Sequence, residues 1–132
     1  EQLTLAAGIP VVIQFTPHLI PVNRGILTTL YLAPGEPFND AAGATKFGEQ
    51  VAACYAAAYA NEPFVRLLEG KALPDTKNVV GTNVCEIAWR LDPRTGRLIV
   101  MSAEDNLVKG AGGQAVQRMN LRCSLPETAG LL

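Results

Sequence analysis

The clearest pattern in the chain is that of two amphipathic helices. Residues 44–60 place apolar side chains at three- and four-residue steps among many alanines, which favour helix, and Pro63 ends the segment. A second helix is predicted over residues 105–121, with Asp105 or Asn106 as its N-cap. The apolar stripes consist of Phe47, Val51, Cys54, Tyr55 and Ala58 in the first helix and of Val108, Ala115, Val116 and Met119 in the second.

Four further runs of apolar and β-branched residues have the length and composition of strands. They cover residues 11–15, 25–32, 84–91 and 97–103. The turn-forming residues 92–96 lie between the last two runs, so these two are expected to pair as a hairpin.

Prolines and glycines delimit the first part of the chain. Residues 1–7 have the pattern of a helix end, because Gly8 and Pro10 follow in the order that commonly stops a helix. Pro17 and Pro21 exclude helix interior between them, so this segment is expected to be a fixed loop.

The order of the longer elements predicts an α+β fold. Two strands, a helix, two strands and a final helix suit a mixed, mainly antiparallel sheet with helices on one face. The other face, rich in Val, Ile and Leu, would then need cover from a partner domain or a twin subunit.

Composition and charge narrow the class of protein. The 132 residues correspond to one domain, and 48% hydrophobic with 17% charged residues exclude a disordered chain. The net charge of −1 gives no reason to expect a nucleic acid or an anionic membrane as partner. The apolar runs 9–15 and 26–32 are too short to span a bilayer. The chain begins at Glu1 without a signal-peptide pattern, and we expect its true N-terminus to lie upstream.

The cysteines and the single histidine give little support to a metal site or a disulfide framework. Cys54, Cys85 and Cys123 are odd in number and widely spaced, which fits a reducing compartment such as the cytoplasm. One histidine cannot form a His-rich metal cluster within one chain, so no metal is expected.

Three features have side chains or amides suited to binding a ligand. His18 could line a substrate pocket or simply fix the geometry of its loop. Arg24 could bind a phosphate or carboxylate through its planar fork, or form a structural salt bridge. Free amides among residues 110–114 could accept an anion or a cofactor edge, although glycines there also permit close packing.

Several stretches resemble one enzyme family. They are Phe-Thr-Pro-His-Leu-Ile-Pro-Val-Asn-Arg-Gly-Ile at 15–26, Tyr-Ala-Asn-Glu-Pro-Phe-Val-Arg at 59–66 and Asp-Asn-Leu-Val-Lys-Gly-Ala-Gly-Gly-Gln-Ala-Val-Gln at 105–117, with Gly-Thr-Asn-Val-Cys at 81–85 and Leu-Pro-Glu-Thr-Ala-Gly-Leu at 125–131. Together they resemble the N-acetyl-gamma-glutamyl-phosphate reductases of the semialdehyde dehydrogenase superfamily. The family usually has alanine where this chain has Gly112.

The resemblance implies a domain and a reaction. Residues 1–132 would form the C-terminal substrate-binding and dimerisation domain, related in fold to that of glyceraldehyde-3-phosphate dehydrogenase, without the N-terminal NADP-binding domain. The family reduces an acyl phosphate to an aldehyde with NADPH in arginine biosynthesis, as a homo-oligomer. A cysteine thiolate and an assisting histidine upstream of this chain would carry the chemistry, so no catalytic residue is expected here.

The candidate binding residues take specific roles in such a domain. Their side-chain chemistry makes His18 and Arg24 the candidates for binding the substrate, which is a small molecule. The start of the last helix would lie near the nicotinamide end of the cofactor, and the residues expected there are Asn106, Lys109, Gly110 and Gly113.

The physics of the three cysteines agrees that the nucleophile lies elsewhere. Cys54 is predicted in the middle of a helix and Cys85 in a strand, whereas Cys123 follows a helix C-terminus, where the dipole disfavours a thiolate. We expect each to be a small buried residue.

Two other functions remain open from the residues. The chain could be a stand-alone module for dimerisation or protein interaction without catalysis. It could also belong to an aspartate-semialdehyde dehydrogenase, which shares the Asp-Asn-Leu-x-Lys-Gly-Ala pattern but resembles the other stretches less.

Overall fold

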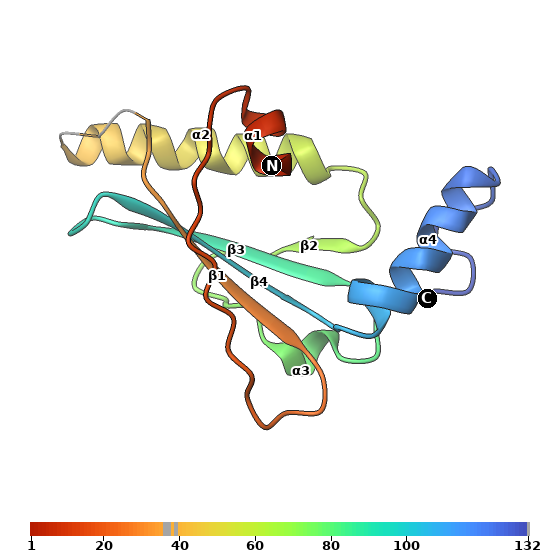
Figure 1. Cartoon of the computed structure of the whole chain (residues 1–132). Coiled ribbons are helices and arrows are strands. Elements are labelled where there is room, and N and C mark those ends of the chain that lie inside the picture. The colour runs from red at the N-terminus through yellow and green to blue at the C-terminus, as the bar shows by residue number, and fades with distance from the viewer. Residues whose placement is uncertain (36–37, 39, 132) are drawn as a thin grey trace.

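The computed structural model describes residues 1–35, 38 and 40–131. Their centre is a four-stranded sheet in the order β1-β4-β3-β2 (Figure 1). Strand β4 pairs antiparallel with both β1 and β3, whereas β2 runs parallel to β3. The strands are β1 (Ile26–Leu32), β2 (Val65–Leu67), β3 (Cys85–Asp92) and β4 (Arg97–Glu104). The predicted α+β class with a mixed, mainly antiparallel sheet is therefore confirmed.

The helices lie around this sheet. The long α2 crosses one face, the short α3 lies beyond the other face, and α4 lies at one end (Figure 1). The bounds are α1 (Gln2–Ala7), α2 (Ala41–Tyr59), α3 (Thr76–Val79) and α4 (Gly113–Arg122), with a π-helical turn η1 (Val108–Gly112) directly before α4. Helix α2 begins three residues before its predicted start because Asp40 caps it by accepting a hydrogen bond from the Gly43 amide at 2.7 Å.

The main core lies between α2 and the α2-facing side of β3 and β4. Val51 of α2 and Leu98 and Val100 of β4 are buried there. The half-buried side chains that pack against them are Phe47, Tyr55, Ile87, Trp89 and Leu91. The predicted helix stripe is thus confirmed at Phe47, Val51 and Tyr55 but wrong at Cys54 and Ala58, which are exposed because the stripe that meets the sheet is narrower than the sequence suggests.

The opposite side of the sheet is covered only in part. Ala88 and Ala103 are fully buried there, next to Glu86. The carboxylate of Glu86 accepts hydrogen bonds from Arg66 of β2 and from the Asp75 amide and Asn78 side chain at α3. These bonds hold α3 against the sheet, so the helices do not all lie on one face as predicted.

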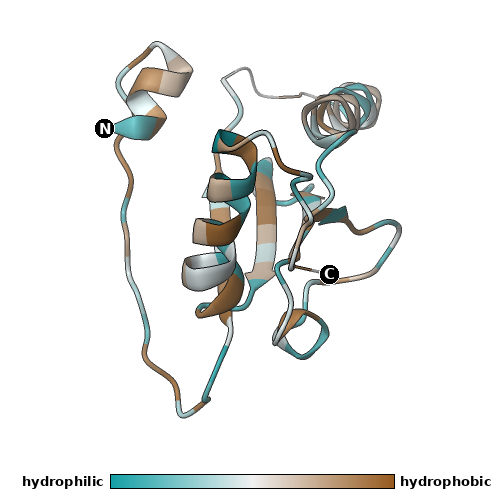
Figure 2. Ribbon diagram, turned by 90° about the vertical axis from the view of Figure 1, so that its right-hand side faces the viewer, coloured by the Kyte–Doolittle hydropathy of each residue, from teal (hydrophilic) through white to brown (hydrophobic). Residues whose placement is uncertain are grey.

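The predicted strand at residues 11–15 is not formed. This stretch is extended but stands off to one side of the domain (Figure 2). Val12 is 97% exposed. A strand needs a neighbour for its backbone groups, and no described residue of this chain pairs with the segment. Its β-branched composition predicted a strand, but no partner strand within the described residues completes it.

Helix α4 buries a different side from the one predicted. Gly113, Gln117 and Asn120 are buried, whereas Ala115 and Met119 are exposed. The predicted apolar stripe is therefore wrong at Ala115 and Met119, whereas Val108 and Val116 are half-buried. Gln117 and Asn120 are buried because they hydrogen-bond to polar groups of the domain. Strand β2 and helix α3 have three and four residues, which is too short for any periodicity to predict.

No helix among the described residues is both long enough and apolar enough to cross a membrane.

Candidate functional site at the end of β4

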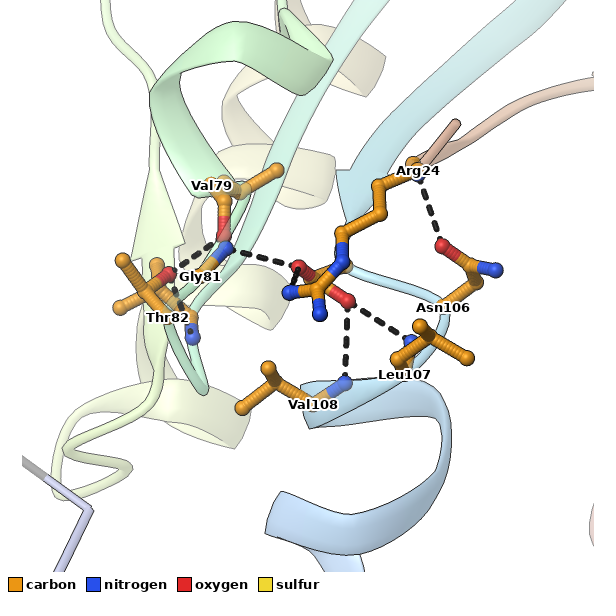
Figure 3. A network of polar contacts seen from close by, with 10 residues as sticks. Arg24, Val79, Gly81, Thr82, Asn106, Leu107 and Val108 are labelled. Carbon is orange, nitrogen blue, oxygen red and sulfur yellow. Dashed lines mark hydrogen bonds and ion pairs between the residues drawn. The ribbon is translucent and has the colours of Figure 1, made fainter. Parts of the chain in front are cut away.

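A buried carboxylate organises the junction between β4 and the last helix. Asp105 is fully buried directly after β4. Its Oδ1 accepts hydrogen bonds from the amides of Leu107 at 2.7 Å and Val108 at 3.0 Å, and its Oδ2 accepts one from the Gly81 amide at 2.7 Å. Figure 3 shows Gly81 reaching this point from a different segment than Leu107 and Val108. The carboxylate thus joins the turn before β3 to the start of the last helix.

Arg24 completes the charge balance of this carboxylate. Its Nη1 lies 3.4 Å from Asp105 Oδ2, and 43% of the Arg24 side chain remains exposed. Burial alone would raise the pKa of Asp105, but the amides of Gly81, Leu107 and Val108 and the Arg24 guanidinium outweigh it, so its pKa is lowered. Asp105 is therefore ionised at neutral pH. Arg24 forms the structural salt bridge that was expected as the alternative to binding a phosphate or carboxylate.

Asn106 ties the approach to β1 to the same junction. Its side-chain oxygen accepts a hydrogen bond from the Gly25 amide at 2.8 Å. Gly25 has φ +106°, and a Cβ there would lie 2.7 Å from the Thr76 side chain, so no other residue fits without displacing α3. Arg24 and Asn106, which were candidates for substrate and cofactor respectively, thereby lie at the same junction.

The last helix begins with one wide turn. The amides of Gly110, Gly112 and Gly113 donate to the carbonyl oxygens five residues earlier, those of Asp105, Leu107 and Val108. Gly110 is exposed on this turn, whereas Gly113 is buried. A Cβ on Gly113 would overlap Asn83 Oδ1 and lie 2.8 Å from the Val108 side chain, so this glycine serves close packing. Wide turns of this kind occur frequently at functional sites.

Lys109 projects from the same turn. Its ammonium donates a hydrogen bond to Gln117 Oε1 at 2.8 Å and lies 5.5 Å from the centre of the buried Phe64 ring. Gln117 also accepts from Asn83 and donates to Glu127. The sequence did not indicate a role for Asn83 or Gln117, because Asn and Gln are mostly surface residues. The one available signal was the helical spacing of Gly113, Gln117 and Asn120.

His18 lies apart from these groups. It is exposed in the extended segment before β1, and its Nδ1 is 3.1 Å from the Thr16 carbonyl oxygen. No hydrogen bond joins it to Arg24 within the part of the chain that the structure describes. A substrate role for His18 stays a prediction.

The cysteines differ from expectation in burial. Cys54 and Cys123 are exposed rather than buried, and Cys85 is half-buried. Burial raises the pKa of the Cys85 thiol, and Glu104 raises it further, while Lys109 opposes these effects without cancelling them. Cys85 is therefore a neutral thiol at pH 7, which is the wrong protonation state for a nucleophile.

The sequence of this domain matches a known protein family. The family described as "Semialdehyde dehydrogenase, dimerisation domain" matches residues 1–106. The chain belongs to this family. The domain is also similar over nearly its whole length to proteins named N-acetyl-gamma-glutamyl-phosphate reductase.

Three of these relatives illustrate the similarity. Identity is 53% over 131 residues with the protein of Geobacter sp. (strain M21) and 52% over 131 residues with that of Akkermansia muciniphila, in both cases over 99% of this chain. It is 49% over the complete chain with the protein of Symbiobacterium thermophilum. The chain spans 35–36% of the length of these relatives.

The first prediction concerns Asp105→Asn. Because the folded-state pKa of Asp105 is lowered, its charge stabilises the fold fully above the ordinary pKa of about 3.9, and this stabilisation is lost as pH falls through the folded pKa. The substitution should reduce the free energy of unfolding at pH 7 by about 2–3 kcal/mol. The reason is that the NH₂ group of the new asparagine would face N–H donors and could not accept from them. Urea unfolding followed by fluorescence of the single tryptophan, Trp89, measures it.

The loss caused by Asp105→Asn should shrink at pH 3. Asp75→Asn, at the exposed N-cap of α3, is the control and should change stability by no more than about 0.5 kcal/mol. An equal loss at both pH values would contradict a role for the charge.

The second prediction compares two glycines of the wide turn. Gly113→Ala should destabilise the domain by about 2 kcal/mol or more, because its methyl group overlaps Asn83 in a buried site. Gly110→Ala meets only ordinary contacts of 3.5 Å or longer and should change stability by less than about 1 kcal/mol. Thermal unfolding of both variants distinguishes packing from simple helix propensity, and equal effects would argue against the packing role.

Proposed function

We propose that this chain is the substrate-side and dimerisation domain of an NADP-dependent N-acetyl-gamma-glutamyl-phosphate reductase. The observation that carries the proposal is identity of about 50% over 99% of the chain to proteins of that name. Because the chain spans about 36% of their length, the nucleotide-binding domain would lie outside it. The reaction would take place in the cytoplasm, which suits three free cysteines.

The proposed reaction begins with a thiolate attacking the carbonyl carbon of the acyl phosphate. The carbon–oxygen bond to phosphate breaks, phosphate leaves, and the acyl group remains on the sulfur as a thioester. NADPH supplies the hydride that reduces this thioester, after which the aldehyde leaves and the thiolate is restored. The raised pKa of Cys85 and the positions of Cys54 and Cys123 outside the junction support a nucleophile from the other domain.

The residues of the β4 junction would form one wall of the pocket. The guanidinium of Arg24, whose side chain is partly exposed, and the Lys109 ammonium are cations suited to anionic substrate groups. Asn106, Lys109 and Gly110 are at least partly exposed, so the nicotinamide end of the cofactor can reach them. Gly113 does not fit a direct cofactor contact, because Asn83 covers it.

The first strand offers a surface for the partner subunit. Leu27 and Tyr31 of β1 project from the side of the sheet opposite α2 and are well exposed. Ile99 and Met101 of β4 lie beside them on that side and are half-buried. An apolar strip of this kind supports association into a dimer or tetramer.

The activity of the full-length protein tests the proposal. It should reduce N-acetyl-gamma-glutamyl phosphate with NADPH, and it should do so at least about a hundredfold faster than aspartyl phosphate, because its pocket would be built for the acetylated substrate. This chain alone should give no turnover. Preference for aspartyl phosphate would favour an aspartate-semialdehyde dehydrogenase, and no turnover with either substrate would favour a non-catalytic module.

A single substitution tests the association surface. Leu27→Asp in the full-length protein should weaken dimerisation by about tenfold or more in sedimentation velocity, since it places a charge within an apolar interface. Leu73→Asp is the matched control, because Leu73 is 58% exposed against 62% for Leu27 but lies in the loop after β2. Equal effects of the two variants would count against β1 as the interface.

A further inference from the structure

Lys109 is a half-buried cation held by a neutral group. Its ammonium donates to Gln117 Oε1 at 2.8 Å and lies over the ring of Phe64. The ion pairs within the described residues involve Arg24, Arg66, Lys77 and Arg94, and no described carboxylate pairs with Lys109. An ammonium has three donors, so at least one is free for a further acceptor.

Glu127 fixes the direction of the hydrogen bonds around this cation. Its carboxylate can only accept, and it accepts from Gln117 Nε2 at 2.6 Å. Gln117 Oε1 must therefore face the other way, where it accepts from both Lys109 Nζ and Asn83 Nδ2. Gln117 is 6% exposed and Asn83 1% exposed, so neither amide can turn freely.

This arrangement leaves one buried acceptor unsatisfied. Because Asn83 Nδ2 is directed at Gln117, its Oδ1 faces Gly113 and has no hydrogen-bond partner among the described residues. A buried acceptor without a partner costs about 1–3 kcal/mol. A partly satisfied network is a poor device for stability. What this network does fix is the position of Lys109, through the bond from its ammonium to Gln117.

We propose that Gln117 is a positioning residue that holds the Lys109 ammonium while leaving its charge free for a phosphoryl group of the ligand. A carboxylate at position 117 would pair with Lys109 directly and neutralise it, whereas an amide supplies only a dipole. The inference deepens the proposed function, since the acyl phosphate and the nicotinamide cofactor both carry phosphoryl groups.

The decisive variant is Gln117→Glu in the full-length reductase. It replaces the side-chain NH₂ by an oxygen, which adds a negative charge beside Lys109 and turns the donor that faces Glu127 into an acceptor. If Lys109 binds the acyl phosphate, the KM for that substrate should rise about tenfold or more while kcat changes much less. The inhibition constant for inorganic phosphate should rise in parallel, and the dissociation constant for NADPH, measured by fluorescence, should stay constant. If the phosphoryl group belongs to the cofactor, the NADPH dissociation constant should rise instead.

Asn120→Asp is the matched control. It makes the same amide-to-acid change one turn further along α4, where Asn120 donates to the backbone oxygens of Glu127 and Ala129. It should lower thermal stability but leave all three ligand constants within about twofold, because it does not touch Lys109. Gln117→Met, which keeps the volume without a charge, serves as a second variant if Gln117→Glu does not fold, and it should raise the same constant to a smaller extent.

One outcome would contradict the role of Gln117, and a different outcome would contradict the proposed function. If Gln117→Glu and Gln117→Met lower stability but leave KM, phosphate inhibition and NADPH binding unchanged, Gln117 is structural and the inference is wrong. If the unmodified reductase binds phosphate and NADPH but does not turn over N-acetyl-gamma-glutamyl phosphate, the proposed function fails, while the binding comparison between variants still tests Gln117.

Discussion

A single buried carboxylate holds together the part of the fold that carries the candidate site. Asp105 can remain charged in the interior only if its oxygens are satisfied, because an unpaired buried charge is strongly unfavourable. Its donors come from Gly81, Leu107 and Val108, and Arg24 adds the opposite charge from the approach to β1. These segments are distant in sequence, so the turn, the strand end and the helix start must form together. The same carboxylate therefore determines where Lys109 and Asn106 lie.

The sequence predicted the elements whose signals are local. The helical spacing of apolar residues at 44–60 is a signal within one helix, and the turn residues at 92–96 are a signal within one hairpin. Both elements were found where expected. The failures concern burial, which depends on what each element meets. Residues 11–15 have strand composition, but the described chain offers no strand to pair with them. Met119 was predicted inside, but α4 turns a polar side inward, where Gln117 hydrogen-bonds to Asn83 and Glu127.

The site was predictable in its residue types but not in its contacts. Side-chain chemistry singled out Arg24, and resemblance to the reductases singled out Asn106 and Lys109. The structure places all three at or beside the β4 junction. Asp105 was predicted only as a helix cap, because its bond to Gly81 spans 24 residues that no local pattern connects. Gln117 was missed for the same reason, since its importance comes from partners on other elements.

The wide turn η1 imposes a constraint on chain length. An α-helix advances about 100° per residue, so one surplus residue in the turn rotates everything after it by that angle. Deleting one residue from Val108–Gly112 would permit an unbroken α-helix but would swing Gln117 away from Asn83, which lies before the turn and would stay in place. At this position a change in the number of residues would therefore be more damaging than most changes in their identity.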